Sequence, residues 1–369
     1  MAGQQISVKQ GVMMMAMYIL GTTFLVSSGI EAGQDIWIAY LISLGLSLVL
    51  VCMYARMMSH MPGKDFFTIM ETLLGRPLTV IFLIIMSVYL FQHLSYVLRH
   101  FSEYINVAGL PGTPLVASLI SMGLLCALGV IYGIEVLGKW SEWFLLFVAA
   151  FIILAALLLT REMHIDYLRP ILQNGFAPIA KGVWALISFP FGQLVAFLFI
   201  LPPARTKREP YRIFILGLLI GGALIFVSSM SNVLVLGVKG VARLFYPTYS
   251  TLAIIRIGTF IQRLEIAATT IFMITVFVKA AVLLLGLIRS LARILKLKSY
   301  TFIVIPVMLL AINYGFNAYR GNLEHYTGIA VFVPYFTTFY QIIIPFLIFM
   351  LLEWSAARRR RGKVRDVRE

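Results

Sequence analysis

The sequence predicts an all-α integral membrane protein with the inverted-repeat architecture of a transporter. Of its 369 residues, 61% are hydrophobic and only 12% are charged, whereas soluble domains carry about a quarter charged residues. Ten apolar runs approach the roughly 20 residues that are needed to cross a bilayer. Two of these runs, at matching places in the two halves of the chain, are interrupted, which is typical of inverted-repeat transporters.

The ten predicted spans follow one another without a linker or a low-complexity segment. They lie near 11–29, 36–57, 78–101, 115–135, 143–160, 183–201, 212–237, 265–288, 300–316 and 328–354. We expect a single transmembrane domain over 1–369, with a basic cytoplasmic tail at 355–369. Repeat one covers about 11–160, and repeat two covers about 183–354. The polar start "MAGQQISVKQ" leads into the first span without an obvious cleavage site, so we expect that span to be retained.

Basic residues between the spans predict the orientation of the chain. With the N-terminus inside, the cytoplasmic segments hold 20 Lys and Arg residues and the other side holds 9, with Lys279 set aside. The positive-inside rule then places both termini in the cytoplasm. The net charge of +15 also raises nucleic-acid binding. However, a basic cluster directly after a last span is typical of an anchor that touches anionic lipid, so we expect lipid contact and no nucleic-acid partner.

The sixth span, "LISFPFGQLVAFLFILPP", has Pro190 and Gly192 in the middle of its apolar run. Lipid cannot satisfy freed backbone groups, so such a break is tolerated only where protein or a water-filled cavity takes over their hydrogen bonds. A ligand site is favoured over helix packing because packing needs no proline. The candidate ligand-binding residues of this span are Ser188, Phe189, Phe191, Gly192 and Gln193.

The first span contains a weaker signal in "ILGTTFLVSSG", where Gly21, Thr22 and Thr23 mark either close helix packing or a second part of the site. Half-helix N-termini suit a carboxylate, and unwound carbonyls suit an ammonium or a cation. An amino acid zwitterion carries both groups. Its side chain would meet apolar and aromatic walls, for which Phe189 and Phe191 are candidates.

A polar stripe runs along the third span. Its members recur every three or four residues and therefore share one helical face: Tyr89, Gln92, His93, Tyr96, His100 and Glu103. That face should line the interior of the bundle. For Gln92 and His93 a structural hydrogen bond and a ligand contact are both open, whereas His100 and Glu103 are also consistent with interfacial anchors.

Lys279, in "FMITVFVKAAVLLLGLI", is the one charge well inside a predicted span. It stands about 13 Å from the cytoplasmic end at the helical rise, and Thr275 lies on the same face. An intramembrane lysine needs acceptors and is a functional hypothesis by default. We expect it to point towards carbonyls freed at Gly21 to Thr23, where it would replace a coupling cation. A lysine that reaches the headgroups through a thinned bilayer is the alternative.

Sequence motifs of catalysis and of metal binding are absent. The sequence has no H-E-x-x-H, G-x-S-x-G turn, P-loop or dinucleotide fingerprint. Its five histidines are scattered, and Cys52 and Cys126 lie in separate spans. We therefore expect no enzyme, no cofactor and no metal site.

The connection before the eighth span, residues 239–264, is too long and too apolar for a bare loop. It interleaves aromatic residues with Arg243, Arg256 and Arg263. We expect short helices there that lie at the outer surface over the site, as a lid or as a docking surface.

Three segments together resemble the B subunits of spore germinant receptors, a branch of the amino acid/polyamine/organocation transporter superfamily. They are "MPGKDFFTIMETLLGRPL", "SFPFGQLVAFLFILPP" and "LFYPTYSTLAIIRIGTFIQRLEIAATTIFM", the last ending with Phe260, Arg263 and Glu265. Length and the ten-span plan agree across the chain. Gln193 and Thr259 stand where family members often carry an acidic residue.

The resemblance implies a leucine-transporter-like fold of two inverted five-helix repeats with broken helices 1 and 6, in the inner membrane of a bacterial spore. It further implies a sensor that binds a germinant, commonly an amino acid. The partners would be a membrane A subunit and a C subunit lipoprotein. A secondary amino acid permease, either a uniporter or proton-coupled, is the alternative. A channel or scaffold without a ligand leaves the sixth-span break unexplained.

Overall fold

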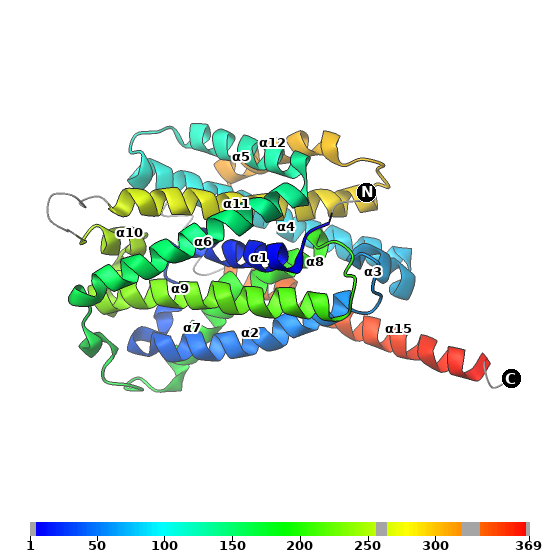
Figure 1. Ribbon diagram of the computed structural model, residues 1–369, viewed down its shortest axis with the longest axis horizontal. Coiled ribbons are helices and arrows are strands. Elements are labelled where there is room, and N and C mark those ends of the chain that lie inside the picture. The colour runs from blue at the N-terminus through cyan, green and yellow to red at the C-terminus, as the bar shows by residue number, and fades with distance from the viewer. Residues whose placement is uncertain (1–4, 256–263, 319–332, 367–369) are drawn as a thin grey trace.

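A computed structural model describes residues 5–255, 264–318 and 333–366, with side chains in the last range described for 335–359. Every regular element among these residues is helical, and the helices form one bundle along a common direction (Figure 1). The long helices are α2 (Ile36–Met58), α4 (Arg76–Tyr104), α5 (Leu115–Tyr132), α6 (Ile134–Leu159), α9 (Arg208–Arg243), α11 (Leu264–Ile294) and α15 (Ile344–Asp366).

Eight helical segments of the described chain are long and apolar enough to cross a membrane. They include two composite segments, Phe176–Ile200 and Tyr335–Arg359, which contain irregular turns. The helices α1 (Val8–Thr23) and α12 (Thr301–Asn317) are shorter and supply the remaining two predicted spans. The first span ends at Thr23 and not near residue 29, because its backbone leaves the helix at Gly21.

Local sequence sets where several helices begin and end. Ser7 caps α1 by accepting a hydrogen bond from the Gln10 amide, and the Gln10 side chain bonds back to the Ser7 amide, which is a capping box. Asp65 caps the short helix α3 (Phe66–Leu74) in a similar way. Gly75, with a φ of 83°, separates α3 from α4, a conformation that glycine adopts without strain.

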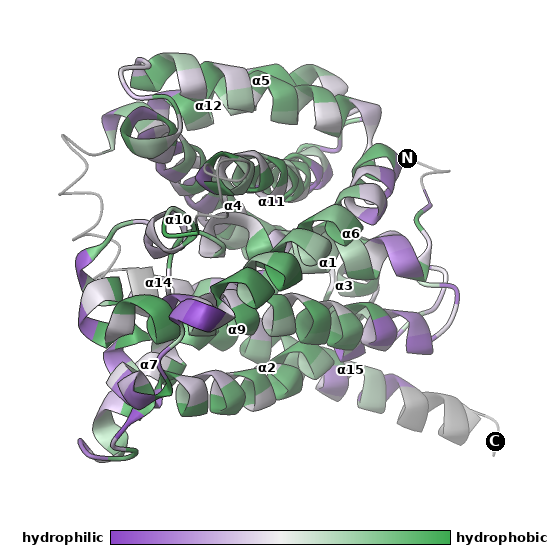
Figure 2. Ribbon diagram, turned by 60° about the vertical axis from the view of Figure 1, so that its left-hand side comes forward, coloured by the Kyte–Doolittle hydropathy of each residue, from purple (hydrophilic) through white to green (hydrophobic). Residues whose placement is uncertain are grey.

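The core of the bundle is formed by α1 and α11. Helix α1 packs against α6, α9 and α11, and α11 also packs against α4 and α5. Both are buried around most of their circumference. By contrast, α2, α5, α6 and α12 expose large apolar side chains, such as Trp143 and Leu310, and these hydrophobic ribbons cover the outside of the bundle (Figure 2). A helix that is apolar all round in this setting faces lipid.

The sixth predicted span is built from short pieces. They are α7 (Phe176–Leu186), a π-turn η5 (Ile187–Phe191), a 3-10 turn η6 (Gly192–Ala196) and α8 (Phe197–Ile200). The backbone leaves helical geometry at Phe189, whose φ and ψ are −151° and 108°. The breaks predicted in the first and sixth spans are therefore both present. Since α1 packs against η5, the two breaks meet inside the bundle.

The last span also begins irregularly. The short helix α14 (Val333–Thr338) runs through a π-turn η7 (Phe339–Ile343) into α15, and η7 packs against η6. A third irregular segment thus reaches the two predicted breaks. π-turns often occur at functional sites.

Candidate ligand site between the broken helices

The first break is a close contact between a backbone and a lysine side chain. Gly21 has non-helical φ and ψ of 6° and −121°, and a Cβ atom at this position would collide with the Lys279 side chain. Only glycine allows so close an approach. The Thr275 hydroxyl lies 3.4 Å from the Gly21 carbonyl oxygen but is also bonded within its own helix. Thr22 and Thr23 are buried beside them.

Lys279 joins the two breaks. Its side chain is fully buried, and its Nζ donates to the Thr22 hydroxyl at 3.2 Å. The ammonium lies 4.8 Å from the centre of the Phe189 ring and 5.2 Å from that of Tyr18, distances at which a cation is attracted to an aromatic face. Lys279 therefore points into the bundle and does not snorkel. Its acceptor is a threonine hydroxyl, whereas the sequence predicted backbone carbonyls.

The second break is crowded around Gly192. A Cβ atom there would lie 2.8 Å from the Ile187 carbonyl oxygen and would also collide with the Gln341 side chain. Pro190 supplies no amide to the helix, and Phe189 turns its ring towards Lys279. Glycine and proline in this span thus create a place where backbone, lysine and a third segment meet.

Gln341, in η7, ties the last span to this place. It is fully buried, and its Nε2 donates to the Tyr89 hydroxyl at 2.9 Å. The Tyr54 hydroxyl donates to the Gln341 carbonyl in a short hydrogen bond and lies 3.5 Å from the Gly192 carbonyl. Tyr89 also stacks on Tyr340. Tyr54 of α2, Tyr89 of α4 and Gln341 of η7 therefore join these three elements to one another and to η6.

The other predicted residues of the sixth span are also buried or half-buried here. The Ser188 hydroxyl lies 3.5 Å from that of Thr338. Phe191 is fully buried and faces Gly222 of α9. Phe191 is thus a wall between α9 and the break, whereas Phe189 reaches the lysine.

The polar stripe of α4 divides into two parts. Tyr89 and His93 are buried and their rings are in contact, with centres 5.6 Å apart. The side chains of His93 and Gln193 lie close to each other, although neither reaches good hydrogen-bond geometry. Gln92 and Tyr96 are half-buried on either side. This first part of the stripe reaches the candidate site.

The second part of the stripe has a structural role. Glu103 is completely buried and accepts a 2.6 Å hydrogen bond from Arg99 Nε. Arg99 also donates to the carbonyls of Gly315 and Phe316 at the end of α12. An interfacial anchor would be exposed, so that interpretation of Glu103 is wrong. The same holds for His100, which is 7% exposed.

Buried polar atoms without hydrogen bonds to the described chain gather around the two breaks. Most buried polar groups in proteins are satisfied, and each unsatisfied one costs about 1–3 kcal/mol. Such a cluster suits a small polar molecule with several donors and acceptors. Its members are the Tyr18 hydroxyl, Thr23 Oγ1, Gln92 Oε1, His93 Nε2, both amide atoms of Gln193 and Gln341 Oε1.

Three residues of this site were missing from the sequence prediction, namely Tyr18, Tyr54 and Gln341. Gln341 is a single amide inside the apolar run "FYQIIIPF", which is a signal of the same kind as Gln193. Tyr18 precedes Gly21 by three residues and therefore lies on the same side of α1. Tyr54 has no comparable signal, because its partners are brought together only by the fold.

A short helix, α10 (Pro247–Leu252), packs against α9 and α11 at the end of the bundle away from both chain termini (Figure 1). The Thr248 hydroxyl donates to the Phe24 carbonyl at 2.7 Å and accepts from Asn232 at 2.8 Å. Tyr246 packs edge-on against Tyr104. A short helix in the 239–264 connection is therefore confirmed.

Arg256, Thr259, Phe260 and Arg263 lie outside the described residues. Their part in a lid or a docking surface stays a prediction.

Comparison with solved structures confirms the fold. A structure of Mhp1, a nucleobase-cation-symport-1 family transporter, in a closed conformation with bromovinylhydantoin bound, has a TM-score of 0.63 at 12% identity and covers 91% of this chain and 78% of its own. An inward-facing conformation of Mhp1 has a TM-score of 0.60 at 11% identity, covering 95% and 80%. The chain thus has the leucine-transporter-like fold, with ten helices in a 5+5 inverted repeat.

Comparison of sequences gives the family. Spore germination protein KB of Bacillus subtilis (strain 168) is 25% identical over 371 residues, 99% of this chain and 99% of its own length. Spore germination protein XB of Bacillus anthracis is 22% identical over 306 residues, 78% of this chain and 82% of its own length. Residues 5–318 match the spore germination protein family. The chain is therefore a multi-pass membrane protein that belongs to this family.

Proposed function

We propose that this protein is the ligand-sensing membrane subunit of a spore germinant receptor. It binds a small nutrient, an amino acid, between the broken helices, and its conformational change is passed to a membrane A subunit and a C subunit lipoprotein to start germination. Membership of the spore germination family and the transporter fold support this proposal. It acts in the spore inner membrane with both termini in the cytoplasm.

The observation that carries the proposal is the position of Lys279. Its ammonium touches residues of both breaks, and α1, α4, η6 and η7, which pack at these breaks, carry the unpartnered polar atoms. An ammonium fixed at this point attracts a carboxylate. The Gly21 carbonyl, next to the Thr275 hydroxyl, suits the amino group of the ligand. The Lys279 ammonium prefers the carboxylate of a zwitterion and the Gly21 carbonyl prefers its amino group, so together they orient it.

The candidate contact set follows from this placement. Gly21, Thr22, Thr23 and Thr275 contact the backbone groups of the ligand. Tyr89, Gln92, His93, Tyr96 and Gln193 form its polar wall, and Ser188, Phe189, Phe191 and Gly192 form the wall at the second break. Lys279 also replaces the coupling cation of ion-dependent relatives.

A secondary amino acid permease is the second candidate, because the fold is that of a transporter. The same rearrangement would then carry substrate across the membrane. Purified protein in liposomes with labelled amino acids separates the two candidates. Saturable binding without stoichiometric uptake supports the receptor. Concentrative uptake supports the permease and contradicts sensing alone.

A further inference from the structure

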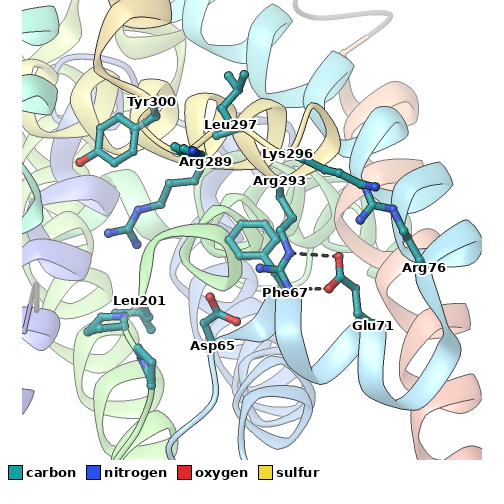
Figure 3. A pocket seen from close by; sticks show the side chains of 14 residues that line it. Asp65, Phe67, Glu71, Arg76, Leu201, Arg289, Arg293, Lys296, Leu297 and Tyr300 are labelled. Carbon is teal, nitrogen blue, oxygen red and sulfur yellow. Dashed lines mark hydrogen bonds and ion pairs between the residues drawn. The ribbon is translucent and has the colours of Figure 1, made fainter. Parts of the chain in front are cut away.

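A cavity of about 670 Å³ (Figure 3) lies beside α3, at the end of the bundle that carries both termini (Figure 1). It lies between α3, the start of α4, residues 201–203 and the end of α11. Its size is that of small-molecule sites, and none of the candidate ligand-site residues lines it. Its charged lining consists of Asp65, Glu71, Arg76, Arg289, Arg293, Lys296 and Lys298.

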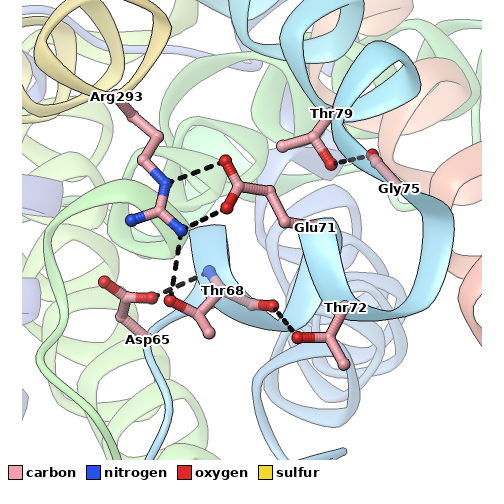
Figure 4. Close-up of polar contacts among 7 residues, drawn as sticks. All are labelled: Asp65, Thr68, Glu71, Thr72, Gly75, Thr79 and Arg293. Carbon is pink, nitrogen blue, oxygen red and sulfur yellow. Dashed lines mark hydrogen bonds and ion pairs between the residues drawn. The ribbon is translucent and has the colours of Figure 1, made fainter. Parts of the chain in front are cut away.

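Both carboxylates of the cavity are engaged by nearby groups. Glu71 accepts two hydrogen bonds from Arg293, at 3.0 and 2.5 Å (Figure 4). Asp65 accepts from the Thr68 amide at 2.8 Å and thereby caps α3. The Arg289 guanidinium donates to the Ile200 carbonyl at 2.5 Å. Glu71 and Arg293 thus neutralise each other, and the cavity keeps an excess of positive charge.

Two of the remaining cations line the cavity from separate elements. Arg76 lies at the start of α4 and Lys296 just beyond α11, both side chains are exposed, and both are labelled around the cavity in Figure 3. Neither forms an ion pair with a residue that the structure describes. Opposite charges attract across a shared cavity. Two cations without ion-pair partners among the described residues therefore favour an anion in this cavity.

The backbone of Lys296 supports the same conclusion independently. The last turn of α11 closes with a hydrogen bond from the Leu297 amide to the Ala292 carbonyl, and Lys296 follows the helix with a φ of 56°. This left-handed position is normally taken by glycine. A strained backbone that persists in a non-glycine residue points to a use for its side chain.

We propose that Arg76 and Lys296 bind an oxyanion of the phosphate class, and that the cavity receives the remainder of the molecule. Arginine offers a planar fork for two phosphate oxygens, and lysine adds a compact charge. Basic pockets between transmembrane helices on the cytoplasmic side bind lipid head groups. The phosphate belongs either to an anionic phospholipid or to a soluble compound. The site is independent of the proposed germinant site.

The test uses the full-length protein purified in a neutral detergent, with inorganic phosphate as the probe at constant ionic strength. Phosphate should raise the melting temperature of the wild type in a saturable way. Arg76→Gln should weaken the apparent affinity at least tenfold. Lys296→Gly should raise the melting temperature without phosphate, since the strained residue is replaced, yet should abolish the phosphate effect.

The matched control is Lys139→Gln, which removes an exposed basic charge outside the cavity and should respond to phosphate as the wild type does. Bilayers of phosphatidylcholine with or without phosphatidylglycerol then identify the source. Stabilisation of wild type but not Lys296→Gly by phosphatidylglycerol assigns the site to a lipid head group. A phosphate effect that is limited to the soluble probe assigns it to a soluble compound. Equal responses of wild type and both cavity variants would overturn the proposal.

Discussion

Lys279 is placed so that one side chain serves both broken helices. Its ammonium is bonded to Thr22 and faces the Phe189 ring. Removing the charge leaves the first break without the group that ties it to α11. A bound cation is the natural substitute, because the Gly21 carbonyl and the Thr22 hydroxyl are both oxygen ligands.

We expect Lys279→Met to shift the germinant concentration for half-maximal response upward by at least tenfold, equivalent to about 1.4 kcal/mol, or to make the response depend on sodium. Lys279→Arg should rescue only in part, because the planar guanidinium needs more room. The measurement is a germination dose-response with and without sodium, at matched protein levels. An unchanged curve in both conditions excludes the cation-substitute role.

At Gly192 the limiting factor is space. Gly192→Leu should abolish the ligand response, because even a Cβ atom meets the Ile187 carbonyl and the Gln341 side chain. Gly45→Leu is the matched control, since a Cβ atom on that α2 glycine has nothing within 4 Å. Membrane insertion of both variants is checked by expression and protease protection. A normal response from well-expressed Gly192→Leu would rule out this part of the site.

Among elements, α4 and α12 are joined by Arg99, which pairs with Glu103 within α4 and donates to the Gly315 and Phe316 carbonyls of α12. Breaking the pair with Arg99→Met leaves Glu103 buried without its guanidinium partner, which costs about 3–5 kcal/mol. We expect a clear fall in the melting temperature in detergent. The double variant Arg99→Met/Glu103→Leu should recover much of the loss, because no charge then remains buried. If the double variant is no more stable than the single one, the loss does not come from the unpaired charge of Glu103, and the pair does more than stabilise the fold.

One threonine, Thr248, bonds the short helix α10 to α9 and to the residue that follows α1. Thr248→Val removes the hydrogen bonds to Phe24 and Asn232, each worth about 1 kcal/mol. Amide hydrogens of residues 247–252 should then exchange several-fold faster, while those of α11 keep their protection. Thr270→Val, which removes an exposed hydroxyl bonded within its own helix, serves as the control. Equal exchange in both variants would show that other contacts hold α10.

The sequence predicted the spans and their breaks because hydropathy and helix-breaking residues are local signals. Pro190 and Gly192 indicated one break, and Gly21 indicated the other. The pairing of Lys279 with the first break also followed from depth and chemistry. Tyr54, which donates to Gln341 across 287 positions of sequence, could not be predicted, because long-range contacts leave no periodic pattern. Glu103 was interpreted as a possible interfacial anchor, since its position in the sequence of a helix does not reveal that its side chain is buried.

At the scale of the whole molecule, each end of the bundle has its own contacts between helices. At one end, Thr248 bonds α10 to α9 and to the residue that follows α1. At the other end, Ser355 of α15 donates to the Leu73 carbonyl of α3, and Glu353 of α15 pairs with Arg56 of α2. The candidate ligand site lies between these two groups of contacts.

Helix α11 is a stiff rod that carries Lys279 and Arg293 14 residues apart, which corresponds to about 21 Å along its axis. If the proposed ligand moves Lys279, α11 acts as a lever with its pivot at that residue. A tilt of about five degrees at Lys279 moves the Arg293 end by about 2 Å, by the same helical geometry. Such a displacement is enough to part the Arg293–Glu71 pair, whose bonds are 2.5 and 3.0 Å long. Binding of one amino acid at the proposed site would thus be converted into loss of the Arg293–Glu71 contact between α11 and α3.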